Sequence, residues 1–269
     1  MKRIKFYSLL CLVALYLVIQ SGCKKKDDSG APALPPSASM DMEGLSNFAS
    51  KKKSISLSTD SSNFKAAWKF VHSWDSITIK FLLVPKLIFI EALTGKEPVY
   101  DNTNEQWTWT YNKAINGNGN YQSVLTGKVS KDSMYWTMTV SLIGGDGLTN
   151  FMWFEGKTDL NQTGGWWKLY EPITKKAYLL ITWDKKSEAT KSIKYTNIFD
   201  LALDKGTYIK YGLSTKADYN AYFDIFCTFP QATAKIEWNT TTYAGQITYS
   251  GYIFGWDSAL HNLTTKPAN

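Results

Sequence analysis

Few side chains in this sequence could carry the chemistry of an active site. Its two histidines are His72 and His261. His72 precedes Asp75 by three residues in a stretch with helical periodicity, which would suit a base and its orienting carboxylate, although a surface hydrogen bond is the alternative. His261 lies far away in the C-terminal tail, and neither histidine belongs to an HExxH or Cys/His group. We therefore predict no metal site and no cofactor.

The carboxylates and the cysteine of the predicted domain form no recognisable catalytic group either. Glu155, Glu171, Glu188 and Glu237 are scattered along the chain. A glycosidase needs two carboxyl groups within about 10 Å, which a sheet could supply by bringing Glu155 to Glu237. Cys227 alternates with apolar residues and predicts a buried, inert thiol. We expect a protein that is not an enzyme, with a hydrolase of sparse active site as an alternative.

Aromatic residues are the most distinctive feature of the composition. They make up 15% of the chain, with 11 tryptophans and 16 tyrosines. Large rings with a polar edge can fill a curved β core, or they can line a site where sugars or apolar ligands stack. Core packing is therefore the alternative for each of our candidate ligand-lining residues, which are Trp107, Trp109, Trp136, Trp153, Trp183 and Trp238.

The elements that must position these rings are short strands. In MYWTMTVSL (134–142), Met134 and Trp136 share one face while Tyr135 and Thr137 share the other, and similar segments follow as far as QITYSGYIFGW (246–256). Turn signals such as 116–119 and 144–147 separate many of them. About ten or eleven consecutive strands with short loops, over about 106–256, predict an antiparallel up-and-down meander that curves or forms an open barrel.

Helices are expected before the strands, at about residues 62–93. Phe64, Ala67 and Val71 recur at helical spacing. The helix should break before Pro85 and be followed by a shorter one, because the residue ahead of a proline disfavours helical geometry. The fold class is thus mainly β with N-terminal helices (α+β), with a helical hairpin capping the sheet. This layout is similar, in outline only, to the open barrels of lipoprotein carriers.

The N-terminus predicts export. Three of its first five residues are basic, and the apolar run at 6–19 is too short to span a bilayer. Ser21-Gly22-Cys23 resembles the lipobox of bacterial lipoproteins, in its relaxed Bacteroidota form because Gln20 stands where leucine is usual. The resemblance implies a signal peptide at 1–22 and acyl chains on Cys23, which would anchor the protein without a membrane helix. An ordinary cleaved signal is the alternative.

The residues after the cysteine predict a localisation signal and a linker. Lys24, Lys25, Lys26, Asp27 and Asp28 resemble the signal that sends Bacteroidota lipoproteins to the outer face of the outer membrane, with the periplasmic face as the alternative. Residues 29–46 are rich in Ser, Pro, Ala and Gly and lack periodicity. We therefore expect a lipidated flexible tether at 23–46 and a single β-rich domain at 47–269.

Charge excludes one class of partner. Lys2, Arg3 and Lys5 fall in the predicted signal, so 27 of the 30 basic residues remain against 23 acidic ones, a net charge of about +4. The lysines are scattered, whereas nucleic-acid binders cluster positive charge and interleave arginine. We therefore expect no nucleic-acid partner.

We expect an envelope lipoprotein that binds a glycan, a lipid or another apolar ligand on an aromatic-lined curved sheet. The alternative is a structural or interaction module that docks another envelope protein.

Overall fold

The computed structural model describes residues 30–51, 60–145 and 147–268, with the backbone alone at 75–81. The chain divides into two compact units, Met1–Pro32 and Ala33–Asn269, and the second holds every described helix and strand. The predicted signal peptide, Cys23 and the Lys24–Asp28 segment lie outside the described residues. In the part of the chain that is described, no helix is both long enough and apolar enough to cross a bilayer.

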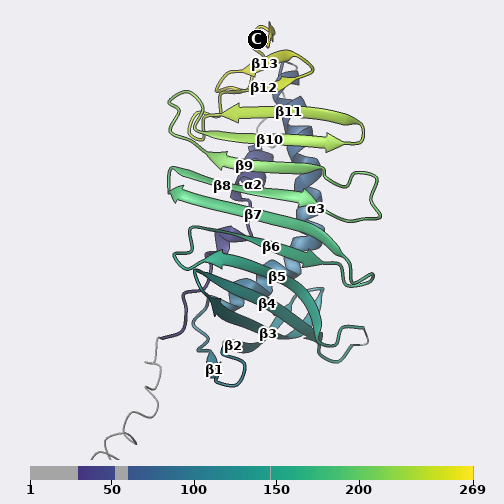
Figure 1. Ribbon diagram of the computed structural model, residues 1–269. Coiled ribbons are helices and arrows are strands. Elements are labelled where there is room, and N and C mark those ends of the chain that lie inside the picture. The colour runs from purple at the N-terminus through teal and green to yellow at the C-terminus, as the bar shows by residue number, and fades with distance from the viewer. Residues whose placement is uncertain (1–29, 52–59, 146, 269) are drawn as a thin grey trace, which may run out of the picture. The chain divides into compact units, whose positions relative to one another are not determined.

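Fourteen strands form one antiparallel sheet, and each strand pairs with its neighbours in sequence (Figure 1). The sheet is not closed, because β1 and β14 stand at its two edges. This confirms the predicted meander behind N-terminal helices. The strands are β1 (Val99–Asp101), β2 (Gln106–Ile115), β3 (Gly119–Ser130), β4 (Ser133–Leu142), β5 (Phe151–Asp159), β6 (Gly164–Tyr170), β7 (Ala177–Ser187), β8 (Thr190–Asn197), β9 (Tyr208–Leu213), β10 (Ala221–Thr228), β11 (Gln231–Trp238), β12 (Gly245–Tyr249), β13 (Tyr252–Trp256) and β14 (Lys266–Pro267).

The sheet has more strands than the ten or eleven expected. The segment 246–256 lies in two strands, β12 and β13, joined by a turn at Ser250 and Gly251. Both turn residues have positive φ, 50° and 78°, as a two-residue hairpin of the primed type requires. The edge strands β1 and β14 are three and two residues long, too short to leave a periodic pattern in the sequence.

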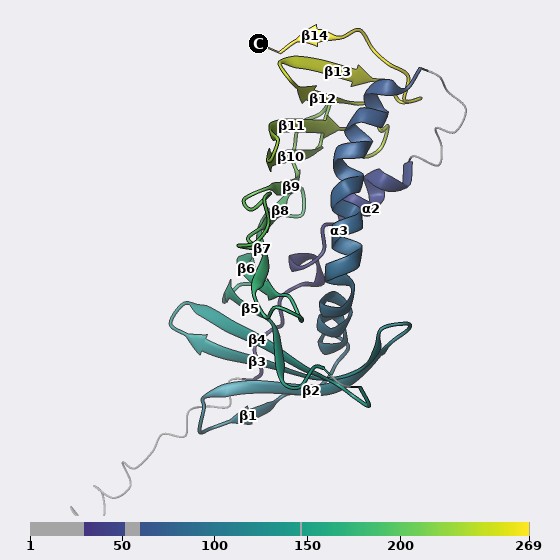
Figure 2. The same cartoon turned by 90° about the vertical axis from the view of Figure 1, so that its right-hand side faces the viewer.

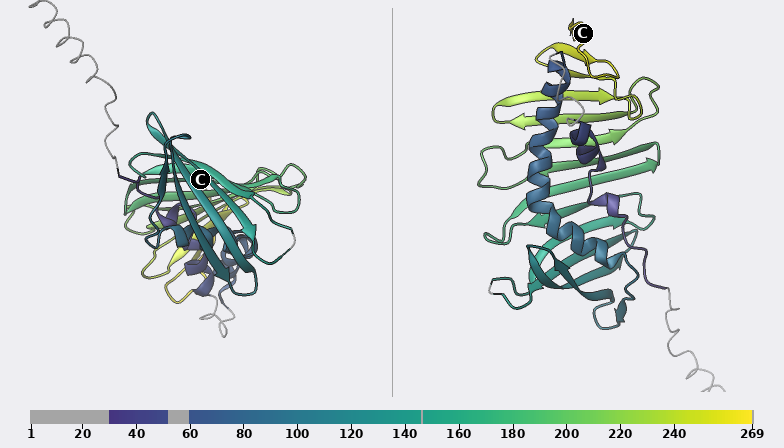
Figure 3. Two further views of the ribbon diagram at one scale, coloured as in Figure 1. Left: turned by 90° about the horizontal axis from the view of Figure 1, so that it is seen from below. Right: turned by 180° about the vertical axis from the view of Figure 1, so that it is seen from behind.

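Helix α3 (Ser62–Ala92) is a single helix of 31 residues that contains Pro85. The expected break before this proline, and with it the hairpin of two helices at 62–93, is wrong. Proline removes one helical hydrogen bond and bends a helix, and the C-terminal part of α3 changes direction (Figure 3). Ile88 and Phe89, just beyond the proline, are fully buried, so their packing offsets the local cost. Among the described helices, α2 (Glu43–Ser50) packs against α3.

Helix α3 crosses the strands on one face of the sheet. Its N-terminal end is tied to β13, where Asn63 Nδ2 donates to the Gly255 carbonyl at 2.8 Å. Its C-terminal end is tied to β2, where the Tyr111 hydroxyl donates to the Ile88 carbonyl at 2.8 Å. A helix of 31 residues is about 46 Å long, close to the roughly 53 Å from β2 to β13. Figure 2 shows the described helices on this face only, and the core lies beneath them.

Residues 33–50 also pack onto the helical face. The short helix η1 (Ser37–Ser39) precedes α2, and Met40 and Met42 are buried. The Tyr195 hydroxyl accepts from the Met42 N–H at 2.9 Å and donates to the Met40 carbonyl at 3.1 Å. The compact unit therefore begins at Ala33 rather than after residue 46, where composition placed the end of the tether. Contacts with distant strands, which leave no local periodicity, hold this segment.

Candidate functional site

The six candidate tryptophans do not form an open aromatic surface. The exposed fractions of five of them are 0–7%, and all five lie on the sheet face that the helices cover: Trp109, Trp136, Trp153, Trp183 and Trp238. Trp107 is partly buried against the Tyr100 ring, with centroids 4.8 Å apart. Their burial favours core packing, the alternative that the sequence left open, although Trp183 also lines a small pocket.

Several core tryptophans lie over glycines of the neighbouring strand. Trp136 stands opposite Gly127, and Trp167 stands opposite Gly156. A Cβ at Gly127 would lie 2.7 Å from the Trp136 ring, and one at Gly156 would meet the Trp167 ring. A glycine therefore leaves room for the large ring, and the ring covers the glycine backbone, a pairing that stabilises β-sheets.

The other residues considered for chemistry lie in different parts of the fold, as far as their side chains are described. His72 stacks on Trp68, with ring centroids 4.2 Å apart, while the Asp75 side chain lies outside the described part. His261 Nδ1 lies 3.5 Å from a carboxylate oxygen of Asp257. Burial, together with Asp204, raises the pKa of the Cys227 thiol, which disfavours the nucleophilic thiolate. Within the described residues, no three His, Cys, Asp or Glu side chains are grouped to hold a metal.

Glu155 and Glu237 share a sheet face but not a site. They lie on β5 and β11, six strands apart, which corresponds to about 29 Å. A carboxyl pair for glycoside hydrolysis needs a separation of about 5–9.5 Å. The hydrolase alternative therefore receives no support from this pair.

The sheet face opposite the helices carries a continuous row of residues that the sequence pattern alone did not identify. Each residue of the row stands directly opposite the next across twelve strands, from β3 to β14. The row contains six lysines and one carboxylate. In strand order it is Lys128, Tyr135, Lys157, Trp166, Thr182, Lys194, Lys210, Asp224, Lys235, Thr248, Ile253 and Lys266. We call these residues the lysine row.

The lysine row places like charges side by side. Lys194 and Lys210 are directly opposite on β8 and β9, an arrangement that destabilises a sheet unless another group compensates. Both ammonium groups lie near tyrosine rings of the same face: Lys194 Nζ is 3.8 Å from the Tyr208 centroid, and Lys210 Nζ is 5.9 Å from that of Tyr222. Such contacts are attractive, and they keep the positive charge close to the sheet surface.

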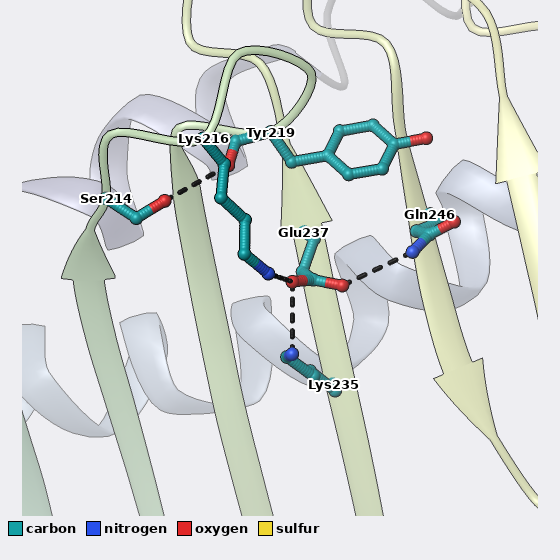
Figure 4. A network of polar contacts seen from close by, with 6 residues as sticks. All are labelled: Ser214, Lys216, Tyr219, Lys235, Glu237 and Gln246. Atoms are coloured by element: carbon teal, nitrogen blue, oxygen red, sulfur yellow. Dashed lines mark hydrogen bonds and ion pairs between the residues drawn. The ribbon is translucent and has the colours of Figure 1, made fainter.

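A polar network flanks the row at β11 (Figure 4). Glu237 Oε1 accepts from Lys216 at 3.2 Å and from Lys235 at 3.0 Å, and Gln246 Nε2 donates to Oε2 at 3.2 Å. Burial alone would raise the pKa of Glu237, but these contacts overcome it and lower the pKa. Burial raises the pKa of Asp224, its diagonal neighbour, despite Lys235 and Lys210, and Glu237 adds to the rise.

Replacement of Glu237 tests this network through its pH dependence. We expect Glu237→Gln to lower the free energy of unfolding by about 1–2 kcal/mol near pH 7, because Lys235 and Lys216 lose their anionic partner. The folded pKa lies below the unfolded value of about 4.3. The stabilisation is therefore full above about pH 5 and is lost as the pH falls through the folded pKa.

Urea denaturation between pH 3 and pH 7 measures the effect. The gap between the wild type and Glu237→Gln should narrow toward pH 3. Glu97→Gln, at an exposed residue, serves as the control and should show a small gap throughout. A gap for Glu237→Gln that does not vary with pH would contradict the ionic role.

One local signal could have pointed to the row. Lysines recur at solvent-facing positions of the alternating strands, as Lys194 and Lys210 do in SIKYTNI and TYIKYGL. Scattered surface lysines are common, however, and only the strand register shows that these lie on one line. No family model, curated protein or solved structure matches this chain at a significant level. Its function is therefore inferred from the arrangement of its own residues.

Proposed function

We propose that this protein is a non-enzymatic binding protein of the cell envelope that holds a linear acidic polysaccharide across the open face of its sheet. The lysine row carries this proposal. It runs across the strands on a face that no described helix covers, and it has six lysines against one carboxylate. A chain of negative sugars lying across the strands would complement that charge.

The spacing of the row suits an extended polymer. Successive lysines are one to three strands apart, which corresponds to about 5–14 Å. A ligand with one charge could neutralise a single pair, whereas the cost of aligning like charges is offset along the whole row only by a ligand with repeated charges. The face is an open sheet surface, so we expect the polymer to bind along it without being enclosed.

The aromatic members of the row favour a sugar over a nucleic acid. Tyr135 and Trp166 stand between the lysines, and rings at such positions can stack on the apolar faces of sugars. The described residues contain no arginine, the side chain that nucleic-acid-binding surfaces use most for guanine and phosphate. The predicted anchor at Cys23 completes the proposal, in which the domain is held at the outer membrane by acyl chains.

Alginate, a linear polymer of uronic acids, tests the proposal, with neutral dextran as the control polymer. We expect purified protein carrying Cys23→Ala, which removes the predicted lipid site, to bind alginate and not dextran in calorimetry. Affinity should fall as salt rises, since salt screens exposed charges. Lys194→Gln combined with Lys210→Gln should weaken alginate binding by roughly tenfold or more, equivalent to about 1.4 kcal/mol.

The matched control is Lys69→Gln combined with Lys96→Gln. It removes the same charge from exposed lysines outside the row, one of them on α3, and should leave affinity nearly unchanged. Equal losses of alginate affinity in the two double variants would mean that binding depends on net charge and not on the lysine row. Equal binding of dextran, or no binding of alginate at low salt, would refute the proposal.

A second candidate, the protein-docking module, is favoured by the hairpin tips along one row of strand ends. The β6–β7, β8–β9 and β10–β11 connections lie on the same side of the sheet (Figure 1). They expose Ile173, Leu203 and Phe229 at 88%, 86% and 71%. Exposed large apolar side chains of this kind mark contact surfaces. Serine substitutions at these three residues should leave alginate binding unchanged if the row is the ligand surface.

A further inference from the structure

A pocket of about 90 Å³ lies on the helix-covered face, between the N-terminal segment and strands β7 to β9. The residues that line it range from a buried floor to an exposed mouth. Trp183, Ile193 and Tyr211 at the floor are 5–8% exposed. The side chains of Glu43 and Glu188 at the mouth are 52% and 79% exposed. One group of a ligand can therefore enter the pocket while the rest of the ligand stays in contact with water.

The volume of the pocket limits the group that can enter. Because a water molecule takes about 30 Å³ of liquid, the pocket has room for a group of roughly four heavy atoms and not for a whole sugar ring. Pro36 and Ala38 contribute apolar surface from the N-terminal segment, and Ile193 contributes apolar surface from the sheet. Transfer of a methyl group from water to such surroundings is favourable. The floor therefore suits a short group that is partly apolar.

The indole of Trp183 is an exception among the core tryptophans. Its Nε1 is buried and has no hydrogen-bond partner within the described residues. By contrast, Nε1 of Trp136 donates to Thr158 at 3.0 Å, and Nε1 of Trp167 donates to Ser39 at 3.2 Å. A buried donor without an acceptor is unfavourable. Trp183 lines the pocket, so a ligand oxygen at the floor would satisfy this donor.

The charges around the pocket compensate one another. Three carboxylates each lie beside a lysine, with N–O distances of 2.7, 2.5 and 3.6 Å in the pairs Asp41–Lys86, Glu188–Lys185 and Glu43–Lys191. Strand alternation places the Asp184 side chain on the opposite face of β7, that of the lysine row. Burial, and secondarily Glu43, raises the pKa of Tyr211 to about 12, so its phenol is neutral at physiological pH. The pocket therefore favours a neutral group that accepts a hydrogen bond.

We propose that this pocket binds the acetamido group of an N-acetylated amino sugar. An acetamido group consists of two carbons, an oxygen and a nitrogen, which matches the volume. Its carbonyl oxygen would accept from Trp183 Nε1, and its methyl group would lie against Ile193 and the apolar wall. The sugar ring would stay at the mouth. Carboxylates that already have a lysine partner keep further lone pairs, so Glu43 and Glu188 could accept from the sugar hydroxyls.

The polar mouth favours a sugar as the carrier of the acetamido group. An acetylated lysine side chain carries the same group on an apolar stem, and that stem would have to lie among the paired charges of Glu43, Glu188 and their lysines. A sugar ring presents hydroxyl groups at the same place, and these hydrogen-bond to such charges. The site is separate from the lysine row on the opposite face. Alginate has no acetamido group, so the tests of the two sites are independent.

N-acetylglucosamine is the probe, and the indole N–H signals in a nitrogen–proton correlation spectrum of the Cys23→Ala protein are the readout. We expect one indole signal, assigned to Trp183 by its absence in Trp183→Phe, to shift on titration. Trp183→Phe keeps an aromatic ring but removes the donor, and it should weaken binding by roughly tenfold. Ala38→Leu adds bulk to a half-buried residue of the wall and should abolish the shift. Trp153→Phe, in a buried tryptophan outside the pocket, is the control and should bind like the parent protein.

Three analogues test which part of the ligand is recognised. Glucose has a hydroxyl in place of the acetamido group, and glucosamine has an ammonium there, so both should bind far more weakly than N-acetylglucosamine. Nε-acetyl-lysine should also bind more weakly, because its stem lacks hydroxyls. Equal binding of glucose or glucosamine would show that the acetamido group is not recognised, and equal binding of Nε-acetyl-lysine would show that the sugar is not. Either result would overturn the proposal, as would an unchanged affinity in Trp183→Phe. Absence of any shift would mean that the pocket holds only water.

Discussion

Trp167→Ala is expected to lower the free energy of unfolding by about 3–5 kcal/mol, the usual cost of truncating a fully buried tryptophan. Trp167 is 0% exposed. Its ring packs against Phe89 of α3 and Phe154 of β5, with centroids 5.5 and 5.3 Å away. Its Nε1 donates to Ser39 of η1 at 3.2 Å. One side chain therefore joins the sheet, the long helix and the N-terminal segment.

Trp166→Ala is the matched comparison, because the adjacent residue points to the opposite face of the same strand. Trp166 is only partly buried and belongs to the lysine row. We expect Trp166→Ala to lower the free energy of unfolding by only roughly 1 kcal/mol. The same variant should weaken alginate binding if the proposed function is right. Urea denaturation followed by circular dichroism measures both variants without depending on tryptophan emission. Similar stability losses in the two variants would mean that the faces are not divided as described.

Phe48→Ala should produce the second largest effect, again about 3–5 kcal/mol. Phe48 is 1% exposed, and its ring lies 5.2 Å from Phe64 of α3 and 5.0 Å from Trp238 of β11 between centroids. Helix α2 has only eight residues, too few to be stable alone. Removing its main aromatic anchor should therefore release the segment as well as leave a cavity.

Limited proteolysis together with thermal unfolding separates these consequences. We expect Phe48→Ala to be cut within residues 33–50 at a protease concentration that leaves the wild type intact. Asn47→Ala, at an exposed position of the same helix, should behave like the wild type. If Phe48→Ala unfolds at the wild-type temperature, residues 43–50 do not contribute to the fold as their burial indicates.

Alternation of apolar and polar residues along the chain determines most of the fold. In β4, the pattern assigns Met134, Trp136, Met138 and Val140 to one face, and all four are buried. A two-residue period arises from each strand's own geometry and does not depend on which strand lies beside it. Consecutive strands with short connections then leave the meander as the simplest arrangement. These features are local, so a single sequence displays them.

Tertiary structure alone decided which residues meet. The lysine row depends on the register of eleven strand pairs, and register is set by turn geometry and bulges that composition does not reveal. The buried tryptophans are distinguished from surface ones by the helices that cover them, and α3 runs through Pro85 because packing against the sheet offsets a local penalty. Residues 33–46 have the composition of a linker. They are nevertheless held in the fold, because Met40, Met42 and Ser39 form hydrogen bonds with strands more than 120 residues away in the sequence. Contacts over such separations are cooperative properties of the folded chain, and no local pattern encodes them.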